Sequence, residues 1–263
     1  MSFAHEPTAG RAHWVYAHPR ADSLNRRLLH AGSAALSDRY QVTVADLYAD
    51  GFTPALGESD WGGSAAVPGN LAAQLGEAYA RGDVQPEVRR EQQRLASAEL
   101  LVLQFPLWWY APPAMLKGWL DRVLQTGFAH GDVDEVTGLP RRYGDGMLAG
   151  RRALIIVTAG DDARSLGPRG LSGDLESLLF PLTHGALWYV GIEALGLHVV
   201  HDADDASGWD DHADHLISRI KGLAEEPARP FRRLLDGDYG RRSRALRPEI
   251  HPGRTDLAIH HQD

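Results

Sequence analysis

The sequence predicts an α/β fold with a doubly wound, five-stranded parallel sheet. Short apolar runs recur along the chain, and nearly every run is followed by a stretch with helical spacing. The clearest run, residues 100–103, reads Leu-Leu-Val-Leu, which is typical of a strand buried on both faces. Strands that alternate with helices imply parallel pairing, because each helix carries the chain back to the start of the next strand.

The individual elements follow from apolar runs, helical spacing and helix-start signals. The expected strands cover residues 13–17, 41–46, 100–103, 151–158 and 195–200. The expected helices cover residues 24–36, 71–81, 86–98, 115–124, 175–189 with an interruption at Pro181, and 207–224. Ser23 suits the N-cap of the first helix, and Pro112 and Pro113 suit a helix start. Five strands joined by right-handed crossovers predict the flavodoxin-like order 2-1-3-4-5.

The chain divides into one domain, residues 1–225, and a C-terminal extension, residues 226–263. Within the domain, residues 57–82 are rich in glycine and alanine and are interpreted as an insertion. The extension is rich in arginine, aspartate and proline and has no strong period. We expect this tail to pack on the domain or on a partner subunit.

Composition excludes several classes of function. The formal net charge is −8, so nucleic acid is not an expected partner. The absence of cysteine excludes disulfides, thiolate catalysis and iron–sulfur clusters. Neither a signal peptide nor a run long enough to span a bilayer is expected, which favours a cytoplasmic protein without membrane insertion. His212 and His215 have no evident third ligand and are interpreted as part of a solvated helix face, so no metal site is expected.

The loop after residues 100–103 carries the strongest functional signal. Residues 104–113 read Gln-Phe-Pro-Leu-Trp-Trp-Tyr-Ala-Pro-Pro. In open α/β sheets, ligands bind at the carboxyl ends of the strands, where this loop is expected. Three adjacent aromatic side chains suit a flat, largely apolar ligand. An aromatic cluster that caps the core is the alternative interpretation.

The loop between the first strand and helix indicates an anion site. It lacks both G-x-G-x-x-G and the Walker A pattern, so it is not a dinucleotide or P-loop fingerprint. His18, Ser23 and Asn25 accompany the N–H groups of a helix N-terminus, which suits phosphate, although Ser23 is equally typical of a simple cap. A site that binds phosphate at this loop and a flat ring at residues 104–113 has the layout of a flavin site. Residues 158–161, Thr-Ala-Gly-Asp, are small enough for backbone to approach such a ligand.

These segments resemble the NAD(P)H:quinone oxidoreductase (DT-diaphorase) family of flavodoxin-like flavoproteins. The matching residues are Ala17-His18 with Ser23-Leu24-Asn25, Asp46-Leu-Tyr-Ala with Phe52 and Pro54, Gln104-Phe-Pro-Leu with Trp109 and Tyr110, Pro113, Leu116-Lys-Gly-Trp119, Arg122-Val, and Gly127-Phe-Ala129. Longer family members, with an insertion before the third strand and a C-terminal tail, bind FAD, and shorter ones bind FMN. The resemblance therefore implies FAD, with FMN as the alternative.

The resemblance also implies which residues form each part of the site. The flavin diphosphate would be held by His18, Ser23, Leu24 and Asn25. The isoalloxazine would be lined by Pro106, Leu107, Trp108, Trp109 and Tyr110. Its other edge would face Thr158, Ala159, Gly160 and Asp161. The substrate would contact Trp109, Tyr110, His130 and Tyr189. We expect backbone N–H groups of residues 107–109 to act as electrostatic donors.

The sequence departs from the family at a tyrosine–histidine pair that stabilises charge on the reduced flavin. Leu166 and Ser172 stand at those positions, and neither can carry positive charge. Arg164, Arg169 and His184 are candidate replacements that the sequence does not rank. The catalytic residues therefore remain unassigned from the sequence.

The implied function is a flavin-dependent oxidoreductase that transfers two electrons from NADH or NADPH to a small planar, quinone-like acceptor. The implied mechanism is a ping-pong hydride mechanism in a cytoplasmic homodimer. Two alternatives stay open: a redox-sensing regulatory subunit of a potassium-efflux system, and an azo- or nitro-reductase.

Overall fold

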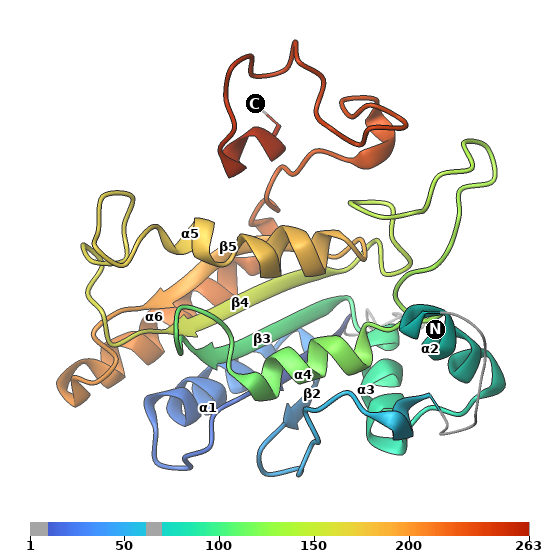
Figure 1. The fold of residues 1–263 in the computed structure, drawn as a ribbon. Coiled ribbons are helices and arrows are strands. Elements are labelled where there is room, and N and C mark those ends of the chain that lie inside the picture. Colours follow the sequence, from blue (N-terminus) through green and yellow to red (C-terminus); the bar gives the residue numbers. More distant parts are fainter. Residues whose placement is uncertain (1–9, 62–69, 263) are drawn as a thin grey trace, which may run out of the picture.

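The structure, a computed structural model, describes residues 10–61 and 70–262 and has the predicted parallel sheet (Figure 1). Its strand order is β2-β1-β3-β4-β5, which confirms the flavodoxin-like order. The strands are β1 Gly10–Tyr16, β2 Tyr40–Asp46, β3 Leu100–Pro106, β4 Arg152–Thr158 and β5 Glu193–Val200. All four strand pairs are parallel, so the carboxyl ends of the strands lie at one edge of the sheet.

The apolar pattern of each strand follows its position in the sheet. The central strand β3 is buried at every residue, as its continuous apolar run predicts. The edge strand β2 is buried only at Ala45. Relative to the expected ranges, β1 begins three residues earlier and ends one residue earlier, β3 ends three residues later, and β5 begins two residues earlier, because the added residues also pair in the parallel ladder.

Helices cover both faces of the sheet (Figure 1). One face packs against α1 Leu24–Leu36 and α6 Trp209–Gly222, with Trp14 and Leu28 among the fully buried side chains. The other face packs against α3 Pro86–Ser97, α4 Ala114–Val123 and α5 Leu175–Leu178. The helix α2 Leu71–Arg81 lies in the insertion before α3, and part of that insertion, residues 62–69, lies outside the described residues. No helix in the described ranges has the length and apolar character to cross a bilayer.

The helix expected over residues 175–189 is divided at the proline. The α-helical part ends at Leu178, and a π-helix covers Pro181–Trp188. Proline lacks the N–H that an α-helix needs and its ring crowds the preceding turn, which accounts for the predicted interruption. π-helical turns are rare and often lie at functional sites.

The C-terminal tail leaves the domain after α6 and turns back over the π-helix. Phe231 is its buried anchor and contacts the rings of Phe180, His184 and Trp188. Beyond this anchor most tail residues are exposed, and in Figure 1 the red segment stands away from the sheet. The division at residue 225 therefore remains a prediction, and besides Phe231 the tail residues Glu226, Arg229 and Arg233 bond to the domain.

Candidate functional site

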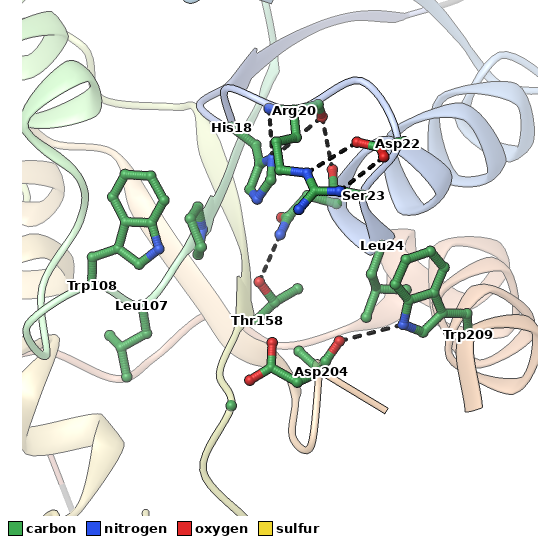
Figure 2. Close-up of a pocket in the computed structure, with 14 residues that line it drawn as sticks. His18, Arg20, Asp22, Ser23, Leu24, Leu107, Trp108, Thr158, Asp204 and Trp209 are labelled. Atoms are coloured by element: carbon green, nitrogen blue, oxygen red, sulfur yellow. Dashed lines mark hydrogen bonds and ion pairs between the residues drawn. The ribbon is translucent and has the colours of Figure 1, made fainter. Parts of the chain in front are cut away.

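A cavity of about 440 Å³ lies at the carboxyl ends of β1, β3 and β4, beside the N-terminus of α1 (Figure 2). We call it the first cavity. Nine sequence-predicted residues line it: His18, Ser23, Leu24, Asn25, Pro106, Leu107, Trp108, Thr158 and Gly160. These residues come from three loops that are up to 142 positions apart in the chain, and the parallel sheet brings the loops together. The volume is within the range typical of small-molecule sites, about 300–1,000 Å³.

The N-terminus of α1 supplies the polar end of the first cavity. Ser23 is the N-cap, and its hydroxyl accepts a hydrogen bond from the backbone N–H of Arg26 at 3.2 Å. The remaining N–H groups of the first turn have no partner within the helix, and the helix dipole favours an anion there. This end of the cavity therefore suits phosphate.

A buried polar network holds that helix end against the sheet. The Asn25 side-chain amide donates to Thr158 Oγ1 at 2.7 Å. The amide of Gln104 donates to the Asn25 backbone carbonyl at 2.7 Å, and its oxygen accepts from the indole of Trp14 at 2.9 Å. The Asn25 side chain is thus hydrogen-bonded to Thr158 at the end of β4. It therefore positions the N-terminus of α1 in addition to lining the cavity.

Two tryptophans stand on opposite sides of the first cavity (Figure 2). Trp108 follows β3, and Trp209 begins α6. Asp204 closes the floor beside Gly160, where an added Cβ would approach Asp204 Oδ2 to 2.8 Å. Five further lining residues were not predicted from the sequence: Arg20, Asp22, Ala203, Asp204 and Trp209. The position of Trp209 after the fifth strand was the available signal, since that strand ends at the same sheet edge.

His18 lies at the mouth of the first cavity, with its ring centroid 6.3 Å from that of Trp108. Burial lowers the pKa of this imidazole, and the nearby guanidiniums of Arg20 and Arg26 lower it further, against a hydrogen bond to the Arg20 backbone that raises it. His18 is therefore neutral at pH 7 and can offer a hydrogen bond to a ligand without adding a charge.

The turn after β3 departs from the expected geometry. Trp108 and Ala111 exchange two backbone hydrogen bonds of 3.1 Å, and Trp109 and Tyr110 between them have φ of 51° and 58°. Such a turn normally takes Asn-Gly, because both central residues are left-handed. Trp109 is 95% exposed and Tyr110 is 44% exposed, and neither lines the first cavity. Their role as walls around the isoalloxazine stays a prediction.

Two of the three backbone N–H groups expected as donors at this turn already bond to other residues of the chain. The N–H of Leu107 donates to Thr158 O at 2.8 Å, and the N–H of Trp108 donates to Ala111 O. Of the three expected donors, Trp109 is the one for which the described residues supply no backbone partner. The loop's contribution is thus mainly steric.

A second cavity of about 430 Å³ lies between α4 and the π-helix, on the other side of the same turn. Its lining is mostly apolar and includes Ala111, Leu120 and Leu182. Two predicted substrate residues, His130 and Tyr189, line it with their rings edge to face at 5.7 Å. Burial lowers the pKa of His130, so this wall is uncharged at pH 7.

Leu166 and Ser172, which stand at the positions of the missing tyrosine–histidine pair, differ in burial and in hydrogen bonding. Leu166 is buried in the core, whereas Ser172 is partly exposed and donates to Asp161 Oδ2 at 2.7 Å. The Ser172 hydroxyl also lies 3.2 Å from the hydroxyl of Tyr110. Asp161, predicted at the flavin edge, thus lies next to the cavity wall residue Gly160 and faces the β3 turn. Ala159 is buried in the core and does not line the cavity.

The candidate replacements for the missing histidine do not supply a free positive charge at the first cavity. Arg164 is paired with Asp162 and its side chain is 93% exposed, and Arg169 is exposed too. His184 is stacked between Phe180 and Tyr143, and burial together with two neighbouring histidines lowers its pKa to about 4. It is neutral at pH 7. Across the described ranges, no group of three potential ligands could hold a metal ion.

The described residues fit a phosphate-bearing ligand with flat rings. Open N–H groups of α1 meet the phosphate requirement, and Trp108 and Trp209 meet the requirement for stacking surfaces. Gly160 keeps the cavity open where any side chain would reach Asp204. The first cavity lies at the carboxyl ends of the strands, which is where open α/β sheets bind ligands.

A profile of the family described as having a flavodoxin-like fold matches residues 11–221. The chain is also 36% identical over 196 residues to the human ribosyldihydronicotinamide dehydrogenase [quinone], covering 73% of this chain and 82% of that protein. The chain belongs to the NAD(P)H:quinone oxidoreductase family of flavodoxin-like enzymes. An uncharacterized NAD(P)H oxidoreductase of Escherichia coli is 38% identical over 222 residues, covering 82% of this chain and 97% of that protein. A crystal structure of a candidate quinone reductase from Klebsiella pneumoniae superposes with a TM-score of 0.90 at 35% identity, covering 97% and 100% of the two chains.

Proposed function

We propose that this member of the quinone oxidoreductase family is a flavin-dependent enzyme that passes two electrons from NADH or NADPH to a quinone-like acceptor. The observation that carries the proposal is the pair of cavities on either side of the turn at residues 108–111. The first cavity has a phosphate end and two indole walls. The second is apolar and suits a planar acceptor. A bound flavin would supply the two-electron chemistry, while the protein supplies binding and orientation.

FAD is the flavin that the first cavity favours. One indole wall would be sufficient for a single ring system, whereas Trp108 and Trp209 offer two on opposite sides of the α1 N-terminus. FAD carries a second ring, the adenine, beyond its diphosphate, and FMN does not. The N–H groups at Ser23 to Asn25 would hold the phosphates between those rings, and Asp204 would lie near a ribose or ring N–H donor.

The proposal is tested by the purified protein's visible absorption, identification of the released flavin, and steady-state kinetics. We expect stoichiometric FAD and quinone reduction with NADH or NADPH. Because one apolar cavity would serve both substrates in turn, double-reciprocal plots at several quinone concentrations should be parallel. Absence of bound flavin, or no quinone reduction by the flavin-loaded protein, would refute the proposal. Converging plots would refute only the ping-pong order.

We infer a homodimer whose tail crosses to the partner subunit. Trp109, Tyr110 and Leu171 expose large apolar surface on adjoining loops at the cavity mouths. Exposed apolar groups concentrated beside a site are typical of an interface. Residues 226–263 contain eight arginines and six acidic residues, whereas the rest of the chain has 19 basic and 29 acidic residues. The tail of one copy is thus electrostatically matched to the body of another.

Ending the chain after Gly237 is expected to convert the dimer to a monomer and to reduce flavin retention. This truncation keeps Phe231 but removes the rest of the tail, including His261, whose ring centroid lies 4.6 Å from that of Phe231. Sedimentation velocity of both forms at equal concentration measures the change, and released flavin is measured by fluorescence. A full-length chain that sediments as a fully active monomer would contradict the dimer.

The two alternatives differ from this proposal in the partner and in the acceptor. Co-purification with a potassium-efflux membrane protein would favour the regulatory subunit, and faster reduction of azo or nitro compounds than of quinones would favour those reductases. A cytoplasmic location remains a prediction that cell fractionation would test.

A further inference from the structure

Three side chains from two loops form a hydrogen-bond chain between the two cavities. Asp161 and Ser172 lie on the loop between β4 and α5, and Tyr110 lies on the turn after β3. Ser172 Oγ is 2.7 Å from Asp161 Oδ2 and 3.2 Å from the Tyr110 hydroxyl. Position 172 is one where the sequence departs from the family pattern.

The chemistry of the three groups fixes the direction of the chain. An ionised carboxylate has no hydrogen, so Ser172 must donate its single hydroxyl hydrogen to Asp161. Ser172 can then only accept from Tyr110. The Tyr110 hydroxyl hydrogen is therefore used within the protein, and the lone pairs of its oxygen are left to accept a hydrogen bond from a ligand.

Tyr110 lies in the turn that separates the two cavities, although it lines neither of them. Trp108, two residues before it, lines the first cavity, and Ala111, directly after it, lines the second. The side chain is 44% exposed and its hydroxyl bonds to Ser172, so the ring is partly accessible on this turn. The left-handed backbone at Tyr110, where φ is 58°, closes the turn through the two bonds between residues 108 and 111.

We propose that Asp161 and Ser172 act as positioning residues that make Tyr110 a hydrogen-bond acceptor for a ring ligand carrying an N–H group, namely the carboxamide of a nicotinamide. The inference rests on the proposed function, because it assigns the specificity of the same site. A ring that carries only carbonyl oxygens, such as a quinone, has no hydrogen to donate to the Tyr110 oxygen. Its oxygens face the lone pairs of Tyr110 unless the tyrosine hydroxyl gives up its bond to Ser172. The chain therefore favours binding of the electron donor over the acceptor.

Two small rings test this directly on the flavin-loaded protein. Benzamide carries carboxamide N–H groups, and acetophenone has the same ring with only a carbonyl. Their dissociation constants are measured from the change in the absorption spectrum of the bound flavin. The wild type is expected to bind benzamide about tenfold more tightly than acetophenone, the ratio given by one hydrogen bond of about 1.4 kcal/mol.

Three variants separate hydrogen-bond direction from a structural tie between the loops. Ser172→Ala frees the Tyr110 hydroxyl to donate to a carbonyl, and Tyr110→Phe removes the hydroxyl, so both should bring the affinity ratio close to one. Ser172→Thr keeps the hydroxyl and should keep the ratio. An unchanged ratio in Ser172→Ala, or an equal loss of affinity for both rings, overturns the inference.

The wild type also separates this inference from the proposed function. Quinone reduction by NAD(P)H is measured on the same preparations. Normal turnover with no preference between the rings, including no binding of either, overturns the inference alone. Absence of turnover by the flavin-loaded wild type refutes the proposed function, and the inference fails with it.

Discussion

Replacing Arg122 with methionine is expected to lower the free energy of unfolding by about 3–5 kcal/mol. The Arg122 side chain is 2% exposed and bonds three groups on different segments. Its Nε donates to Asp60 Oδ1 at 2.9 Å, one Nη donates to Glu87 Oε1 at 2.9 Å, and the other donates to the Thr53 carbonyl at 2.6 Å. The guanidinium thus ties α4 to α3 and to the segment after β2.

The expected loss arises from the groups that the substitution leaves behind. Asp60 is almost completely buried, and without Arg122 its carboxylate would have no counter-charge while the Glu87 carboxylate remains nearby. Methionine fills a similar volume but cannot donate. Chemical denaturation of the flavin-free protein gives the free energy of unfolding. Adding Asp60→Asn to Arg122→Met should recover part of the loss, because it removes the unpaired charge.

Arg81→Met is the matched control, since Arg81 pairs with Glu77 and Asp83 on the surface. Exposed pairs contribute little, so this change should alter stability by less than about 1 kcal/mol. If Arg122→Met unfolded as the control does, or if Asp60→Asn gave no recovery, the buried ion cluster would not be the support that its geometry indicates.

The sequence predicted the sheet and the carboxyl-end location of the site because both depend on local patterns. The buried run at residues 100–103 and the cap Ser23 are readable in a few residues, and β3 and α1 begin where those signals lie. Parallel topology then brings loops at residues 18–25, 104–108 and 158–160 to one cavity. Which residues of those loops line the cavity was implied by the resemblance to the quinone oxidoreductase family.

The details that the sequence did not predict depend on contacts between distant segments. Asn25 was expected to face phosphate, but its amide is bonded to Thr158, 133 positions away. Trp109 was expected to be a pocket wall, but the left-handed turn directs it into solvent. Ser172 gave no sign of its bonds to Asp161 and Tyr110, because a lone serine has no distinctive spacing. In each case the partner is set by tertiary packing, which local propensity does not encode.

Replacing Asn25 with aspartate is expected to reduce flavin affinity on the order of 100-fold. The new carboxylate would lie in the first turn of α1, at the phosphate end of the first cavity. Like charges about 4 Å apart repel by about 4 kcal/mol at an effective dielectric constant of 20, and a 100-fold loss corresponds to about 2.8 kcal/mol. Fluorescence titration of the flavin-free protein with FAD measures the affinity.

The buried position of residue 25 makes this charge costly for folding, although its partners can rearrange. Thr158, which accepts from the Asn25 amide, can donate its own hydroxyl to a carboxylate instead. A negative charge in the first turn of a helix is also favoured by the helix dipole by about 0.3–1 kcal/mol. The free energy of unfolding without flavin is still expected to fall, because Asn25 is only 4% exposed, and flavin affinity is measured on protein whose fold has been checked by circular dichroism.

Gln41→Glu is the matched control, because it adds the same charge at an exposed position at the start of β2, the opposite end of the sheet from the cavity. It should leave FAD affinity within about twofold of the wild type, since charges at that distance are largely screened by salt. Asn25→Leu should weaken binding less than Asn25→Asp, because it removes the bond to Thr158 without placing a negative charge against the phosphates. If Asn25→Asp kept wild-type affinity, the phosphates would lie elsewhere, and the first cavity would hold only the uncharged part of its ligand.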